Sequence, residues 1–152
     1  MTQKSLFKEI AEPRSESSAN TVIANIDGGA RGNPGPAAFG VIIRNPKGEI
    51  VEELSEYLGH QTNNFAEYSG LLAALDYAVR EKCSRLKVRS DSELLVRQMK
   101  GVYKVKNPAL QELFRQAQAL VRKLEHFSIE HVFREQNKDA DRLVNEVLDN
   151  RK

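Results

Sequence analysis

The chain has 152 residues and a formal net charge of +2, from 23 Lys and Arg against 21 Asp and Glu. This length suits one domain with a real hydrophobic core, and 40% apolar and 29% charged residues are ordinary for a globular protein. No apolar run approaches the length that crosses a bilayer, and the N-terminus lacks the apolar core of a signal peptide. Because the single cysteine, Cys83, cannot form an internal disulfide, we expect a cytoplasmic protein.

The first 20 residues are rich in Ser, Glu and Lys and show no sustained hydrophobic period. They predict a mobile tail with at most a short helical piece at residues 6–10. The folded domain is then expected to span residues 21–152.

Three strands are predicted next. Alternating apolar residues indicate a strand over 21–27, with Asn25 and Asp27 on one face. Residues 37–59 predict two more strands, joined at Asn45-Pro46-Lys47-Gly48, a sequence with good turn chemistry. Together they suggest an antiparallel meander.

The hydrophobic period then becomes helical up to about Val79, with Thr62 to Asn64 available as the cap. The remaining predicted elements are a strand over 84–92, a helix over 93–101, a helix opened by Asn107-Pro108, a strand over 127–135 and a helix over 137–150. This order favours an α/β domain whose mixed sheet has a hairpin at one side and helical crossovers at the other.

Four acidic residues are expected at positions where an α/β fold commonly forms a ligand-binding site. Asp27 is expected where the first strand gives way to a glycine-rich loop, and Asp91 ends the fourth strand. If these strands are parallel neighbours, both carboxylates project into the crevice beyond the strand ends. Glu67 is expected in the first turn of the long helix and Asp141 in the first turn of the last one.

Carboxylates that are brought together repel one another and take up protons unless cations neutralise them. Hard oxygen ligands suit Mg²⁺ or Mn²⁺, whereas a lone cysteine and the scattered His60, His126 and His131 make zinc a poor candidate. The sequence therefore predicts a divalent-cation site.

Each feature also has an ordinary explanation. An acid in the first turn of a helix favours the helix dipole, which covers Glu67, Asp139 and Asp141. Asp91 is also explained as a plain N-cap, and the glycine-rich loop as a tight hairpin. His131 alternates with Glu130 in a strand, which predicts a structural or exposed position.

Four blocks in this order resemble ribonuclease H of type 1: IDGGARGNPGPAAFG, TNNFAEYSGLLAAL, VRSDSELLV and NKDADRLVNE. The resemblance covers nearly everything from Thr21 to about Asp149. It implies the ribonuclease H-like fold, with a five-stranded mixed sheet and helices on both faces. It also implies hydrolysis of the RNA strand of RNA/DNA hybrids, leaving 3′-hydroxyl and 5′-phosphate ends. Two Mg²⁺ ions, which Mn²⁺ could replace, would then be bound by Asp27, Glu67, Asp91 and Asp141.

The resemblance further implies a surface that contacts the hybrid. A glycine-rich loop could press its main chain into the shallow minor groove, where 2′-hydroxyls mark the RNA strand. The positions that match the family's substrate contacts are Gly28, Gly29, Ala30, Asn33, Asn63, Asn64 and Glu93. Many relatives have glutamine at Glu93, and a carboxylate near phosphates is unfavourable unless it binds a 2′-hydroxyl or a cation.

Two further departures look similar to an archaeal-like branch of the family. The loop before the last helix, REQN, lacks the family's histidine, so Arg134 or Glu135 is expected to take part of its role, or turnover to be slower. VYKVK replaces the basic handle, and Lys100, Lys104 and Lys106 are either a smaller phosphate-binding patch or solvated helix ends.

Two other functions stay open. One is a catalytically silent nucleic-acid-binding domain that keeps the fold, although a silent binder has no need of four repelling carboxylates. The other is a related metal nuclease on double-stranded RNA or DNA junctions. The expected partner is an RNA/DNA hybrid, and the expected state is a monomer.

Overall fold

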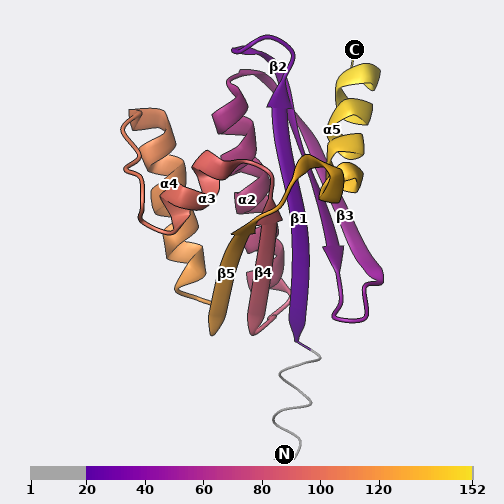
Figure 1. The fold of residues 1–152 in the computed structure, drawn as a ribbon, viewed down its shortest axis with the longest axis vertical. Helices are drawn as coiled ribbons and strands as arrows, with labels where there is room; N and C mark the ends of the chain where they lie inside the picture. Colours follow the sequence, from indigo (N-terminus) through magenta and orange to yellow (C-terminus); the bar gives the residue numbers. More distant parts are fainter. Residues whose placement is uncertain (1–19, 152) are drawn as a thin grey trace, which may run out of the picture.

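A computed structural model of the protein describes residues 20–151, so the predicted tail, apart from Asn20, lies outside the described residues. The described part begins with a strand at Thr21, where the domain was predicted to start (Figure 1). In chain order the elements are β1 (Thr21–Ala30), β2 (Gly35–Arg44), β3 (Ile50–Gln61), α2 (Asn63–Arg80), β4 (Arg85–Ser90), α3 (Glu93–Met99), α4 (Pro108–Val121), β5 (His126–His131), the 3₁₀ helix η1 (Arg134–Gln136) and α5 (Lys138–Asn150).

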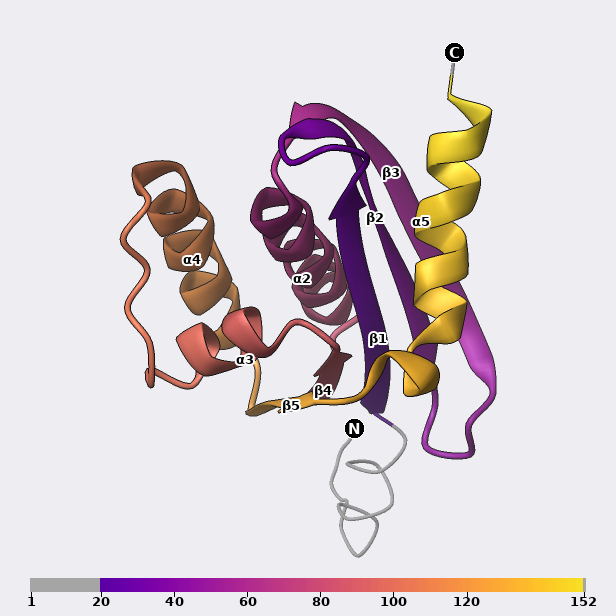
Figure 2. The ribbon, with the colours of Figure 1, turned by 45° about the horizontal axis from the view of Figure 1, so that its top comes forward.

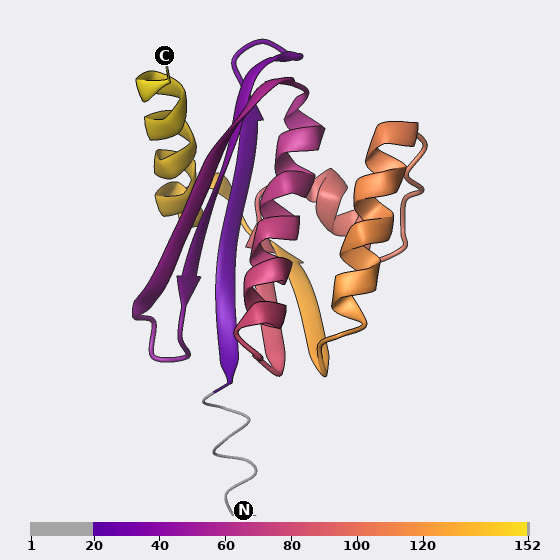
Figure 3. The same ribbon diagram turned by 180° about the vertical axis from the view of Figure 1, so that it is seen from behind.

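The strands form one five-stranded sheet in the order β3-β2-β1-β4-β5. β1 and β2, and β2 and β3, are antiparallel, whereas β4 is parallel to both β1 and β5. α2 and α4 lie on one side of the sheet and α5 lies on the other, as Figures 2 and 3 show. The predicted mixed sheet with helices on both faces is confirmed.

The alternation in β1 separates two environments. Val22, Ala24 and Ile26 are buried in the main core, which α2 shares. Asn25 and Asp27 point to the opposite face, yet only 5% and 8% of their surfaces are exposed. This second face is covered by α5, whose apolar side chains pack in two small clusters that contain Ala38, Ile42, Ala140, Leu143, Val144 and Leu148.

Local turn and cap chemistry agrees with the sequence. Thr62 Oγ1 accepts a hydrogen bond from the Phe65 amide at 3.1 Å, so it caps α2. Asn107 caps α4 through the amides of Ala109 and Leu110. The Gly48 amide closes the β2–β3 turn by donating to the Asn45 carbonyl at 2.9 Å.

The glycine-rich segment differs from the prediction. β1 continues through Ala30 and β2 begins at Gly35, so only residues 31–34 form a turn. The reason is that the β1–β2 ladder extends to the pair Ala30 and Ala37. The last strand is also shorter than predicted, because it ends at His131 and a 3₁₀ helix follows. Among the described helices, none is both long and apolar enough to span a membrane.

Candidate active site

Two of the predicted acids meet because β1 and β4 are parallel neighbours. Ile26 and Ser90 form the last pair of this ladder, so Asp27 is the next residue of β1 and Asp91 is the first residue after β4, one position beyond the strand end that was predicted for it. β4 ends there, whereas β1 runs on, so Asp27 lies within a strand and not at its end. The expected crevice is therefore beyond the end of β4 and beside the continuing β1.

Glu67 reaches these two acids from α2. It lies in the second turn and not in the first, because α2 already begins at Asn63 and its first turn holds no acid. The helix-dipole explanation for Glu67 is therefore wrong. α2 comes close to β1 at Gly28, where an added Cβ would lie 2.3 Å from the carbonyl carbon of Ala66.

The three carboxylates form a compact group. One oxygen each of Asp27, Glu67 and Asp91 lies within 4.8 Å of the others. Glu67 Oε1 is fully buried and has no hydrogen-bond partner among residues 20–151. A buried oxygen without a donor is costly unless a cation binds it, so this donor set fits a hard divalent ion. The group is a site that could hold a metal ion.

Asp141 enters from the opposite side, on α5. It lies in the first turn of that helix, as predicted, and outside the compact group of three. Its carboxylate is near enough to Asp27 to raise the pKa of Asp27. The Asp141 side chain also accepts a hydrogen bond from Asn145 Nδ2 at 3.3 Å.

The proton affinities of these acids reflect burial and mutual repulsion. Burial, and then the charge of Asp91, raise the pKa of Asp27 to about 8. Burial raises the pKa of Glu67 well above its ordinary value, with Asp27 and Asp91 adding to the shift. Burial also raises the pKa of Asp91, although the positive charge of Arg134 opposes this effect. Without a cation, Asp27 therefore binds a proton at neutral pH, and burial favours the protonated form of Glu67 as well.

The four acids line an open cavity of about 710 Å³. Arg134 is in its wall, whereas Glu135 lines a separate cavity of about 240 Å³. His131 is exposed, as predicted, but it also lines the main cavity and its charge lowers the pKa of Asp91. Phe133 is 69% exposed and packs edge to face against His131 at the same wall. The pattern of β5 gave no sign that His131 and Phe133 would face the acids.

The predicted substrate-contacting residues divide into two groups. Gly28, Gly29, Ala30 and Asn63 line the cavity. Asn33, Asn64 and Glu93 do not, and Glu93 is exposed and ion-paired with Arg97 at 2.5 Å.

Asn33 and Asn63 fasten the strand turn to α2. The Asn63 amide donates to Asn33 Oδ1 at 3.0 Å, and the Ala30 amide donates to Asn63 Oδ1 at 2.8 Å. Both side chains thus use their oxygen within the protein. Within residues 20–151 their Nδ2 groups have no partner, and they remain available as donors.

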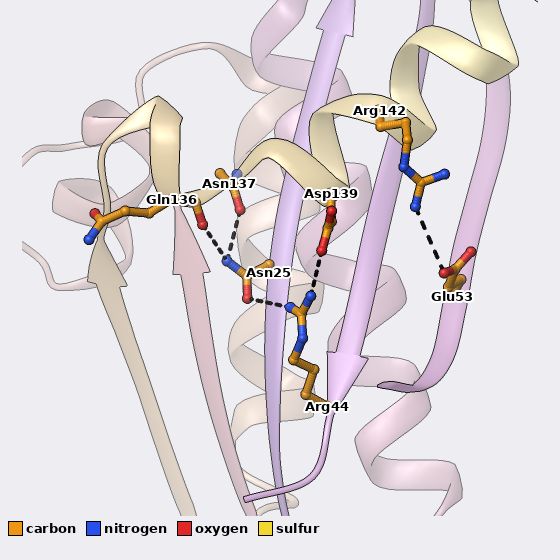
Figure 4. A network of polar contacts seen from close by, with 7 residues as sticks. All are labelled: Asn25, Arg44, Glu53, Gln136, Asn137, Asp139 and Arg142. Carbon is orange, nitrogen blue, oxygen red and sulfur yellow. Dashed lines mark hydrogen bonds and ion pairs between the residues drawn. The ribbon is translucent and has the colours of Figure 1, made fainter. Parts of the chain in front are cut away.

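A polar network on the α5 side was not predicted. Asn25 contacts Asn137 and Gln136, and Arg44 contacts Asn25 and Asp139 (Figure 4). The available sign was Asn25, a polar residue between the apolar Ala24 and Ile26. Its partners are 111 and 112 residues away in the chain, so local patterns did not identify them.

Comparison with known proteins supports the resemblance. The family model described as "Reverse transcriptase-like" matches residues 25–147. The chain is 43% identical over 129 residues to a bifunctional protein of Mycobacterium tuberculosis, covering 84% of this chain but only 35% of that relative. It also spans 64% of the ribonuclease HI of Halobacterium salinarum. The chain is thus shorter than these curated relatives.

Solved structures agree with both the fold and the sequence match. The crystal structure of ribonuclease H1 from Halobacterium salinarum has 40% identity and a TM-score of 0.83, covering 86% of this chain and 99% of that one. LC11-RNase H1, solved in complex with an RNA/DNA hybrid, has 45% identity and a TM-score of 0.79, covering 84% of this chain and 96% of that one. With its predicted motifs and its observed fold, the chain belongs to the reverse transcriptase-like family and, within it, to the type 1 ribonucleases H.

Proposed function

We propose that this chain is an endonuclease that hydrolyses the RNA strand of RNA/DNA hybrids and leaves 3′-hydroxyl and 5′-phosphate ends. The observation that carries the proposal is the convergence of Asp27, Glu67 and Asp91 at an open cavity, with a buried Glu67 oxygen that lacks a partner among the described residues. The hybrid-bound LC11-RNase H1 structure supports the substrate class, because that protein is 45% identical to this chain.

The four acids would hold two divalent cations, Mg²⁺ in the first place and Mn²⁺ as a substitute. When bound, a pair of such ions supplies an activated water and stabilises the leaving oxygen of an in-line displacement. Asp27, Glu67 and Asp91 offer a preformed set of oxygens, and Asp141 adds a carboxylate from α5. The cavity's openness to solvent suits a large substrate that lies across it.

The strand segment beyond Asp27 would supply the recognition of RNA. Gly29 carries no side chain and lines the cavity, so a duplex can approach its main chain closely. Asn33 and Asn63 would donate from Nδ2 to sugar or base edges, because their oxygens are already used. Lys100, Lys104 and Lys106 are exposed and would add contacts to phosphates.

Arg134 would supply part of the role of the family's loop histidine. It lines the cavity and its charge lowers the pKa of Asp91, whereas Glu135 faces a different cavity. A cation at this wall can attract a phosphate and favour the ionised form of a metal-binding acid.

The other two functions are less well supported. In a nucleic-acid-binding domain that binds no metal, nothing would offset the cost of burying the Glu67 oxygen, which has no partner among the described residues. A nuclease that acts on double-stranded RNA or on DNA junctions would use the same four acids. It differs from the main proposal only in its substrate. A cytoplasmic location and a monomeric state remain predictions from the sequence.

The test uses one labelled sequence prepared as RNA/DNA hybrid, double-stranded RNA and double-stranded DNA, with Mg²⁺ or Mn²⁺. We expect metal-dependent cleavage of the RNA in the hybrid alone, and its loss in Asp27→Asn. Asp76→Asn is the matched control, since Asp76 is an exposed acid of α2 that is paired with Arg80 and does not line the main cavity. Hybrid binding without cleavage under either metal would instead indicate the silent binder.

A further inference from the structure

Asn25 and Asn137 form a buried pair of amides beneath the active site. Their exposed fractions are 5% and 1%. Asn25 Nδ2 donates to Asn137 Oδ1 at 2.9 Å (Figure 4). Asn137 Nδ2 in turn donates to the Ile26 carbonyl at 2.8 Å. Both polar groups of Asn137 are therefore used, which removes the usual cost of burying an amide.

Arg44 extends this pair toward the surface. Its Nη2 donates to Asp139 Oδ2 at 2.6 Å and its Nη1 to Asn25 Oδ1 at 3.5 Å. Arg44 ends β2 and Asp139 lies in the first turn of α5. The same residues thus connect two central strands to the start of one helix.

The network meets the active site at two backbone positions. Ile26, whose carbonyl accepts from Asn137, directly precedes Asp27. The amide of Asp141 donates to the Asn137 carbonyl at 3.1 Å. The second of these bonds is the ordinary main-chain i to i−4 bond at the start of α5, so the specific link is the Asn137 side chain, which joins the residue before Asp27 to the residue directly before α5.

Asp141 is the acid whose position depends most on such hydrogen bonds. Asp27 and Asp91 follow a shared strand pair, and Glu67 is fixed by the close packing of α2 on Gly28. Asp141 instead comes from α5, which packs on the opposite face of the sheet through small apolar clusters. Hydrogen bonds are directional, so they can fix the position of the helix start more narrowly than apolar packing does.

We propose that Asn25, Asn137 and Arg44, together the α5 latch, position Asp141 against Asp27 and thereby set the affinity of the second of two cations. This inference rests on the proposed two-metal function. The latch residues are positioning residues, since none of them lines the main cavity. Changes to hydrogen bonds behind metal ligands commonly reduce metal affinity by about 10- to 100-fold.

The test measures metal binding without substrate. Calorimetric titration with Mn²⁺ is compared among the wild type, Asn25→Ala, Asp141→Ala and the double variant. We expect Asn25→Ala to weaken the weaker site by about tenfold or more while the tighter site changes little. In the Asp141→Ala background the same change should have no further effect on metal binding, because the latch acts through Asp141.

Two other variants separate positioning from stability. Arg142→Ala removes a different polar contact of α5, to Glu53 of β3 at 4.0 Å, and should leave both metal affinities unchanged (Figure 4). Arg44→Ala acts at the more exposed end of the latch, so it should weaken Mn²⁺ binding at the second site less than Asn25→Ala does. If Asn25→Ala fails to fold, Arg44→Ala should still fold and provides the test.

Lower thermal stability with unchanged binding of both Mn²⁺ ions in Asn25→Ala and Arg44→Ala would overturn the proposal. An equal loss at both sites would also overturn it. If wild-type protein binds two ions but cuts no hybrid, the proposed activity fails while the latch proposal can still be judged.

Discussion

Gly28 of β1 and Ala66 of α2 touch so closely that a Cβ on Gly28 would lie 2.3 Å from the Ala66 carbonyl carbon and 2.5 Å from the Glu67 amide nitrogen. No side chain at position 28 fits in that space. Because Gly28 has none, α2 can approach β1 and bring Glu67 beside Asp27. The smallness of Gly28 therefore has an internal cause, in addition to any contact with substrate.

Gly28→Ala should push α2 away from β1 and lower the free energy of unfolding by about 1–3 kcal/mol. Cleavage should fall as well, because Glu67 moves with the helix. Gly29→Ala is the matched control: its added Cβ would meet only Val144 Cγ1 at 3.9 Å, which is ordinary contact. Urea unfolding of both variants checks the difference, and equal stability of the two would contradict it.

Gly29→Ala also tests the approach of the hybrid. If the main chain at Gly29 enters the minor groove, an added methyl group should raise KM severalfold and leave stability near that of the wild type. Steady-state kinetics on a hybrid gives KM, and an unchanged value would show that the duplex keeps its distance from Gly29.

The metal-free protein should lose stability as the pH rises. Burial and the charge of Asp91 raise the pKa of Asp27 from 3.8 to about 8, so the folded form binds this proton more tightly than the unfolded chain. The resulting stabilisation is fully present below the unfolded value and is lost as the pH rises through the folded value.

Urea unfolding in the presence of a chelator measures this loss of stability. The pH values should run from 3.8, the ordinary pKa, to above the folded value of about 8. Asp27→Asn should show a shallower decline, because its amide does not titrate, and added Mg²⁺ should stabilise the wild type most at high pH. If wild type and Asp27→Asn have the same pH dependence, the carboxyl of Asp27 is not the titrating group.

Arg134→Ala should slow hybrid cleavage by about tenfold, because Arg134 is exposed, whereas loss of a buried transition-state donor typically costs ~10²–10³ in rate. Its loss also removes a positive charge that lowers the pKa of Asp91, so the rate should need a higher pH to reach its plateau. Glu135→Gln is the neighbouring control and should keep the wild-type rate, since Glu135 lies outside the main cavity. Identical rates for Arg134→Ala and wild type would remove Arg134 from the reaction.

Lys100, Lys104 and Lys106 should contribute to the salt dependence of hybrid binding. Each lysine that contacts a phosphate steepens the slope of log K against log salt by roughly 0.7–0.9, so replacing all three by Gln should reduce the slope by up to about 2–3. Binding titrations at several salt concentrations give the slope. A slope equal to that of the wild type would mean that Lys100, at the end of α3, and Lys104 and Lys106, between α3 and α4, are only solvated.

Local sequence patterns predicted much of this fold. Thr62 and Asn107 cap helices as expected, and the turn at Asn45 closes as its composition indicates. Asp27 and Asp91 could be placed together because two parallel strands end their pairing at Ile26 and Ser90. These features depend on a few adjacent residues or on a general rule of sheet topology.

Other features depend on contacts between distant segments. The continuation of β1 past Asp27 is set by its pairing with β2, which a glycine-rich sequence does not suggest. The partner of Asn25 is 112 residues away, so a polar residue in the strand could be noticed but its role could not be derived. His131 faces the acids only because β5 pairs with β4, and its own alternation could not show this.

β4 stops at Ser90 while β1 continues for four more residues, to Ala30. On the edge of β1 that β4 does not cover, the Ala30 amide donates a hydrogen bond to Asn63 Oδ1. The candidate active site thus lies beside the part of β1 that has no β4 residue paired with it. Asp27, Gly28, Gly29 and Ala30 all lie beyond the last β1–β4 pair and all line the main cavity, so the unequal lengths of the two strands leave the space that the cavity occupies.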